Sequence, residues 1–105
     1  MRKIEAAMNR AIVDGQNWHS ANTRVEYEND SRISKVYLHG NLIAEVGETF
    51  VKLSDGGWRT STTKSRLNAI LRECGDNDSI YQKNHTWFIR TKQGVEPFYN
   101  GICLM

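Results

Sequence analysis

WRTSTTKSRLNAILRE, residues 58–73, is the stretch that decides the fold of this chain. Apolar side chains at spacing i, i+3, i+4 and i+7 lie on one face of an α-helix, and here they are Leu67, Ile70, Leu71 and Cys74. Hydroxyl groups at the start of a helix accept from its free N–H groups, and the candidate caps are Ser61, Thr62 and Thr63. Gly75 follows, where a left-handed residue commonly ends a helix. The stretch predicts a helix over 62–74 with one buried face.

The same helix carries a basic flank. Lys64, Asn68 and Arg72 are four residues apart, so they form one row beside the apolar stripe. Trp58 and Arg59 lie just upstream, near the free N–H groups of the first turn, which favour an anion. We interpret these five residues as a surface that binds a partner. A helix flank that is merely solvated would show the same row, so both interpretations remain open.

Residues 2–14 predict another helix, which Gly15 would end. Its apolar residues recur at helical spacing and are Ile4, Ala7, Met8, Ala11 and Ile12. The polar face is expected to carry Lys3, Glu5, Asn9 and Arg10. Arg66 of the later helix falls outside both the stripe and the basic row. We expect Arg66 to cap a loop or to pair with a carboxylate inside the fold.

Between the two helices the hydrophobic pattern changes to a period of two, which is typical of strands. Four strands are expected, at residues 23–28, 32–39, 42–46 and 49–53, after a polar connection at 16–22. Gly40-Asn41 predicts a tight hairpin turn. Ile33 is out of phase with Val36, which predicts a bulge or an irregular start of this strand. In the third strand Leu42, Ala44 and Val46 would face the core.

The C-terminal part predicts a hairpin of residues 79–83 and 86–91 across Asn84-His85. Pro97 indicates that residues 95–105 form an edge or irregular strand. The predicted fold class is therefore α+β, an antiparallel sheet (meander plus C-terminal hairpin) with two helices packed on one face. At 105 residues, a single domain over 1–105 is expected.

Composition and targeting signals narrow the class of protein. The formal net charge is only +2, which permits an acidic partner without demanding one, and dedicated nucleic-acid binders are commonly more basic. The start of the chain does not resemble a signal peptide, and no apolar run is long enough to cross a membrane. We therefore expect a cytoplasmic protein in which Cys74 and Cys103 are buried free thiols.

Catalytic and cofactor chemistry have no support in the sequence. The three histidines and two cysteines lack the spacing of a metal site, and no glycine-rich phosphate loop occurs. No serine or cysteine sits in a nucleophile motif, so we expect no enzyme, no cofactor and no metal. Aromatic residues on the predicted sheet could stack nucleic-acid bases, although such residues are more often cross-strand pairs or core; they are Tyr27, Tyr37, Tyr81 and Trp87.

Two segments carry a family resemblance. One is the strand-turn-strand L-H-G-N-x-I-A at residues 38–44, and the other is G-W-x-T-x-T-T-x-S-R-L-N-A-[LI]-L. The second comprises Gly57, Trp58, Thr60, Thr62, Thr63, Ser65, Arg66, Leu67, Asn68, Ala69, Ile70 and Leu71. Together they resemble small proteins of tailed bacteriophages, over roughly the middle third of the chain and more loosely the first helix. The resemblance implies a phage source and no particular chemistry.

The resemblance also implies a style of function, because small phage proteins of this kind commonly bind host machinery, including defence systems such as CRISPR complexes. The expected function is that of a non-enzymatic phage protein that binds and modulates a host protein or nucleoprotein complex, most concretely an inhibitor of a host defence system. The alternative is a direct nucleic-acid-binding protein that uses the basic helix 62–74. Nucleic-acid affinity would fall log-linearly with salt, which separates the two in part.

Overall fold

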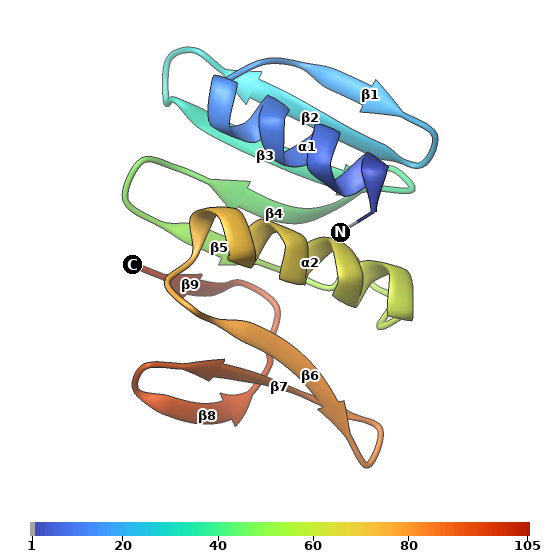
Figure 1. The fold of residues 1–105 in the computed structure, drawn as a ribbon, viewed down its shortest axis with the longest axis vertical. Helices are drawn as coiled ribbons and strands as arrows, with labels where there is room; N and C mark the ends of the chain where they lie inside the picture. The colour runs from blue at the N-terminus through green and yellow to red at the C-terminus, as the bar shows by residue number, and fades with distance from the viewer. Residues whose placement is uncertain (1) are drawn as a thin grey trace.

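The computed structural model describes residues 2–105, and within them two helices and two antiparallel sheets form an α+β fold (Figure 1). This confirms the predicted fold class. The elements in chain order are α1 (Lys3–Asp14), β1 (Trp18–Ser20), β2 (Thr23–Glu28), β3 (Ile33–Leu38), β4 (Asn41–Val46), β5 (Val51–Leu53), α2 (Ser61–Cys74), β6 (Ser79–Lys83), β7 (Thr86–Thr91), β8 (Gly94–Pro97) and β9 (Ile102–Leu104). No helix within these residues has the length and apolar character needed to cross a bilayer.

The larger sheet has the strand order β1-β2-β3-β4-β5-β9, and both helices lie side by side on one of its faces (Figure 1). The helices are parallel: Asn9 of α1 donates to the Ala69 carbonyl and Ser65 of α2 donates to Glu5, each pair sixty residues apart. Their N-termini therefore lie at the same edge of the molecule. The core forms between this helical layer and the sheet, around fully buried side chains such as Met8 and Leu67.

The expectation of one continuous sheet is wrong, because β6, β7 and β8 form a separate three-stranded sheet. Pro97 ends β8 and Phe98 turns inward. The Phe98 N–H donates to the Trp87 carbonyl at 2.9 Å, and the residue is 4% exposed. The chain then reverses at Gly101 (φ +87°), whose N–H donates to the Leu53 carbonyl. Residues 95–105 are thus divided between the two sheets, with β9 at the edge beside β5.

Two strand details also differ from the prediction. The polar connection at 16–22 contains β1, which pairs with β2 through Trp18↔Val25 and Ser20↔Thr23. A three-residue strand of mixed polarity carries too little periodicity to be recognised. The bulge lies in β4 and not near Ile33, because Val36 pairs with Ala44 whereas Tyr37 pairs with Leu42.

The bulge reverses the faces of two neighbouring side chains. Ile43 is the extra residue and is 1% exposed, whereas Leu42, which was expected inside, is 37% exposed. The hairpin turn before it consists of His39 and Gly40, both with positive φ (52° and 78°), and not of Gly40-Asn41. This places the hydrophobic side chain of Ile43 beneath the loop that leads into α2.

The helix predictions are confirmed in position and corrected at the ends. Gly15 is left-handed (φ 63°) and ends α1, and the face of α2 with Leu67, Ile70 and Leu71 is buried. Gly75 is not left-handed, because its φ and ψ are −89° and −171°, and its N–H still bonds to the Leu71 carbonyl. Within α1, Glu5 and Asn9 lie on the buried side and not on the predicted polar face; they are 1% and 2% exposed.

Candidate functional site

The loop before α2 is held in place by one carboxylate. Asp55 Oδ1 accepts from the Gly57 N–H at 2.7 Å, and Oδ2 accepts from Arg59 Nε at 3.0 Å. Asn100 Oδ1 accepts from the Asp55 N–H at 2.8 Å, which ties the loop to the turn before β9. Burial alone would raise the pKa of Asp55, but the hydrogen bonds from Gly57 and Arg59 outweigh burial and hold that pKa below its usual value. The loop is therefore a fixed structure.

Arg59, one of the five predicted contact residues, is engaged mainly within the fold. Besides pairing with Asp55, its Nη2 donates to the Phe98 carbonyl at 3.2 Å. Its guanidinium carbon lies 5.5 Å from the ring centroid of Trp87 and 5.4 Å from that of Phe98. Arg59 thus links the loop to the smaller sheet, and only 37% of its side chain is exposed.

Trp58 behaves differently from its neighbour. Trp58 is 69% exposed. Within residues 2–105 its indole makes no aromatic stacking contact and no cation–π contact. Its backbone N–H donates to the Asp55 carbonyl at 3.2 Å, so the position of the residue is fixed although its side chain is open to solvent.

A hollow with a volume of about 380 Å³ lies beside Trp58. Its lining comes from the β3–β4 hairpin and the start of α2, and comprises Leu38, His39, Asn41, Ile43, Asp55, Gly56, Trp58, Thr60, Thr62 and Thr63. Gly56 has φ +68°, and a Cβ there would lie 3.0 Å from Ile43 Cγ2, so this wall requires glycine. The two sequence segments that carry the phage resemblance therefore meet at one surface depression.

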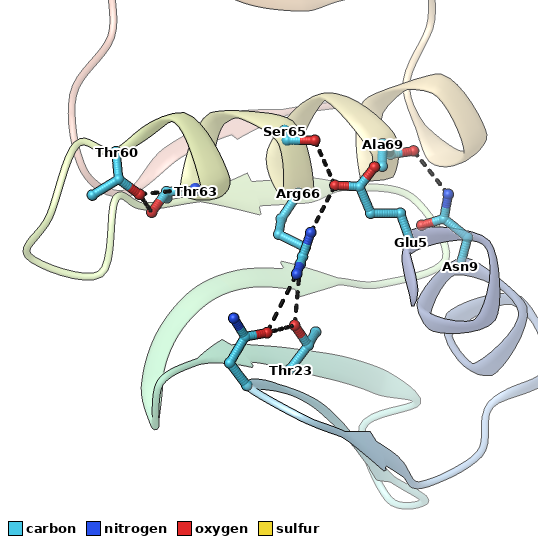
Figure 2. A network of polar contacts seen from close by, with 9 residues as sticks. Glu5, Asn9, Thr23, Thr60, Thr63, Ser65, Arg66 and Ala69 are labelled. Carbon is cyan, nitrogen blue, oxygen red and sulfur yellow. Dashed lines mark hydrogen bonds and ion pairs between the residues drawn. The ribbon is translucent and has the colours of Figure 1, made fainter. Parts of the chain in front are cut away.

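Thr60 caps α2, one residue before the three predicted candidates. Its Oγ1 accepts from the Thr63 N–H at 3.1 Å and shares a 2.9 Å hydrogen bond with Thr63 Oγ1 (Figure 2). Residues 60–63 all carry a hydroxyl group, so each of the four could cap the helix. Thr60 is the cap because its backbone is extended (φ −104°, ψ 165°) and the helix begins at the next residue.

The basic row on α2 is divided by the structure. Arg72 is exposed and Lys64 is half-buried, and neither lies within ion-pair distance of a carboxylate in the described part of the chain. Asn68 instead clamps β6: its Oδ1 accepts from the Ile80 N–H at 2.7 Å and its Nδ2 donates to the Ile80 carbonyl at 2.8 Å. Asn68 therefore has a structural role, and the two cations beside it are the parts of the row that remain open to a partner.

Arg66 pairs with a carboxylate inside the fold, which is one of the two roles that the sequence predicted for it. Its Nη1 donates to Glu5 Oε2 at 2.9 Å, and its Nε donates to Thr23 Oγ1 at 3.1 Å (Figure 2). Ser65 Oγ donates to the same Glu5 oxygen at 2.5 Å. Burial would raise the pKa of Glu5, but the hydrogen bonds from Ser65 and Arg66 hold that pKa below its usual value. This network joins α1, α2 and the larger sheet.

The predicted sheet aromatics do not form an open stacking surface. Trp87 is 2% exposed and belongs to the core, the alternative to base stacking that the sequence left open for it. Tyr81 and Phe88 stack on each other with centroids 5.6 Å apart, and Arg90 lies 5.1 Å from the Tyr81 centroid. Tyr37 is covered by Arg24 at 4.4 Å. The ring faces of Tyr37 and Tyr81 are therefore largely occupied by neighbours, and Tyr27 is half-buried.

Both cysteines are free, but they are not equally buried. Cys74 is half-buried, and burial, with a smaller contribution from Glu73, raises the pKa of its thiol. Cys103 is exposed in β9, so the prediction of two buried thiols is wrong for this residue. In the part of the chain that the structure describes, no three His, Cys, Asp or Glu side chains are grouped so as to hold a metal ion.

A family model described as Kyanoviridae Gp96 protein matches residues 1–105. Searches of curated proteins and of solved structures find no significant match to the chain.

Proposed function

Because the chain belongs to the Kyanoviridae Gp96 family, a family of phage proteins, we propose that it acts without catalysis, by binding a host macromolecule in the cytoplasm of the infected cell. The most concrete form of this proposal is inhibition of a host defence system such as a CRISPR complex. The phage origin supports a host target, and the surface around Trp58 supports binding.

The observation that carries the proposal is the exposed indole of Trp58 beside the 380 Å³ hollow. Tryptophan is enriched among the residues that dominate protein–protein binding energies. Burying apolar surface contributes about 25 cal/mol per Å², so an indole left in water favours association. Since the loop of Trp58 is already fixed by Asp55, a partner would not have to order it on binding.

The chemistry of the hollow favours a protein partner. Leu38 and Ile43 are 4% and 1% exposed in its wall, and Asp55 has its carboxylate oxygens occupied by Gly57 and Arg59. The hydroxyls of Thr60 and Thr63 are bonded to each other. A neutral, mainly apolar side chain suits this lining better than a phosphate group.

The test is a pull-down from host lysate with wild-type protein, Trp58→Ala and Tyr99→Ala, each with and without nuclease. Tyr99 is a matched control, because it is also an exposed aromatic residue (55%) outside the hollow. We expect Trp58→Ala to lose a protein that wild type and Tyr99→Ala retain, whether or not nuclease is present. Retention by a folded Trp58→Ala protein, or equal loss with Tyr99→Ala, would refute the proposed surface.

The second candidate function, direct nucleic-acid binding through α2, has one observation in its favour. Lys64 and Arg72 carry charges that no carboxylate of the described chain pairs with. Whether this basic surface extends beyond α2 depends on where the other unpaired Lys and Arg residues lie.

A further inference from the structure

The unpaired cations of this protein are concentrated on its helices. The chain has fourteen Lys and Arg residues, all within the described part, and seven of them form ion pairs. Five of the other seven belong to α1, its N-cap or α2, and we call them the helical basic face: Arg2, Lys3, Arg10, Lys64 and Arg72. By contrast, every cation on the larger sheet is paired with a carboxylate.

The two helices present these cations on a common layer. Lys3 and Arg10 are seven residues apart, so they share one side of α1, and both are exposed. The opposite side of α1 holds the buried Glu5 and Met8. The helix α2 lies parallel to α1 and beside it (Figure 1), and contacts it through Ser65. The exposed Arg72 therefore lies on the same outer layer, with the half-buried Lys64 on its flank.

Few negative charges lie on this outer layer, and they are at the C-terminal ends of the helices. The exposed carboxylates of the helices are Asp14 and Glu73, both in the last turns, while Glu5 is buried and paired with Arg66. The parallel arrangement also places the two positive N-terminal helix ends at the same edge. The potential of the layer is therefore positive, and most so towards that edge.

The side chains between the cations indicate what kind of polyanion fits. Ala6, Ala7 and Ser61 are exposed there, and neither helix contains an aromatic residue. A protein interface commonly needs a large anchor such as tryptophan, and here that anchor lies off this layer, at the hollow. Single-stranded nucleic acid needs aromatic stacking platforms, which the layer also lacks. Phosphate contacts need only Lys, Arg, hydroxyl groups and helix N-termini.

We propose that the helical basic face binds the phosphate backbone of double-stranded nucleic acid without reading base sequence. None of its five cations lines the Trp58 hollow, and the face extends the basic row of α2 to α1. Small side chains let the duplex approach the helices closely, and the cations replace its counterions. Such binding is non-specific, with a Kd on the order of 10⁻⁴–10⁻⁶ M at physiological salt.

The experiment is fluorescence anisotropy of a labelled 20-base-pair DNA duplex of arbitrary sequence, titrated with the protein at several salt concentrations. If about four cations contact phosphates, affinity should fall roughly 100-fold between 50 and 200 mM salt. Arg10→Gln and Arg72→Gln should each reduce the slope of log K against log salt by about 0.9. Lys83→Gln is the matched control, since Lys83 is an exposed, unpaired cation outside the face.

Four outcomes would overturn the proposal: no duplex binding at 50 mM salt, an equal effect of Lys83→Gln, unchanged slopes in both arginine variants, or tighter binding of a single strand of the same length. Melting curves check that each variant is folded. Trp58→Ala should leave duplex affinity unchanged, so failure of this inference and failure of the proposed protein-binding surface give different results.

Discussion

Glu5 of α1 and Arg66 of α2 form an ion pair of 2.9 Å in which the side chains are only 1% and 4% exposed. Both partners have further hydrogen bonds, from Ser65 to Glu5 and from Arg66 to Thr23, so neither charge is left without compensation. A buried pair of this kind is not a large net source of stability, because desolvation offsets much of the attraction. It does fix the position of α1 against α2, and so the arrangement of the helical basic face.

Removing one member of this pair should be strongly destabilising. Glu5→Ala leaves the Arg66 charge buried without its carboxylate, and we expect a loss of about 3–5 kcal/mol in the free energy of unfolding. Glu48→Ala, which breaks the exposed Arg32–Glu48 pair, is the control and should cost about 0–1 kcal/mol. Urea denaturation measures both. Similar losses for the two variants would contradict a special role for the buried network.

Stability should fall in acid because of Glu5 and Asp55. In the folded protein both carboxyl groups have pKa values below their ordinary values of 4.5 and 3.8. Between the folded and unfolded pKa values, the unfolded state therefore binds more protons. Their contribution is complete above the unfolded pKa values and is lost as pH falls through the folded ones. The melting temperature should therefore drop steeply below about pH 4.5, and Glu5→Gln should flatten that dependence.

Asn68→Ala should lower stability, although Asn68 was predicted as a surface contact. The substitution removes both hydrogen bonds to Ile80 and leaves the backbone of β6 unpaired at that point, at a cost of about 1–3 kcal/mol. Asn29→Ala, at an exposed turn residue, is the control and should have little effect. Equal melting temperatures for the two variants would show that the clamp on β6 is unimportant. Tests of partner binding should accordingly use Lys64→Glu with Arg72→Glu and leave Asn68 intact.

Leu71→Asp should unfold the protein, because Leu71 is 1% exposed and the change buries an unpaired charge in the core. Its neighbour Arg72 is exposed, so Arg72→Asp introduces the same carboxylate on the solvent side and should stay folded. Far-UV circular dichroism and thermal melting distinguish the two. A native spectrum for Leu71→Asp would contradict the phase of α2.

The sequence predicts the elements well because periodicity is a local signal. The stripe of Leu67, Ile70 and Leu71 is enough to define α2, whereas strand partners depend on contacts that no local pattern encodes. The division of residues 95–105 between two sheets is of this second kind. The bulge in β4 is another example. Pairing with β3 makes Ile43 the extra residue, so that Ile43 is buried and Leu42 is exposed.

In the candidate site, too, the features that depend on contacts between distant segments could not be predicted. Exposure of Trp58 and burial of Trp87 could not be distinguished by residue type, because both are tryptophans. The place of Arg66 on the helical wheel left two roles open, a loop cap or an internal ion pair. Its partner Glu5 is set by the packing of α1 against α2, which the sequence does not show. The hollow could not be predicted either, because Leu38 and Thr62 meet only after the hairpin folds onto the start of α2.

The two thiols should react at different rates with a disulfide reagent such as DTNB. The thiolate is the reactive form, so the raised pKa and partial burial of Cys74 slow its modification, while Cys103 is exposed in edge strand β9. At pH 8 we expect one thiol per native chain to react rapidly and the second only slowly. Cys103→Ser should abolish the fast phase, Cys74→Ser should preserve it, and unfolding in guanidinium chloride should make both thiols fast. Two fast thiols in the native protein would mean that the end of α2 opens readily, and a fast phase that survives Cys103→Ser would contradict the burial of Cys74.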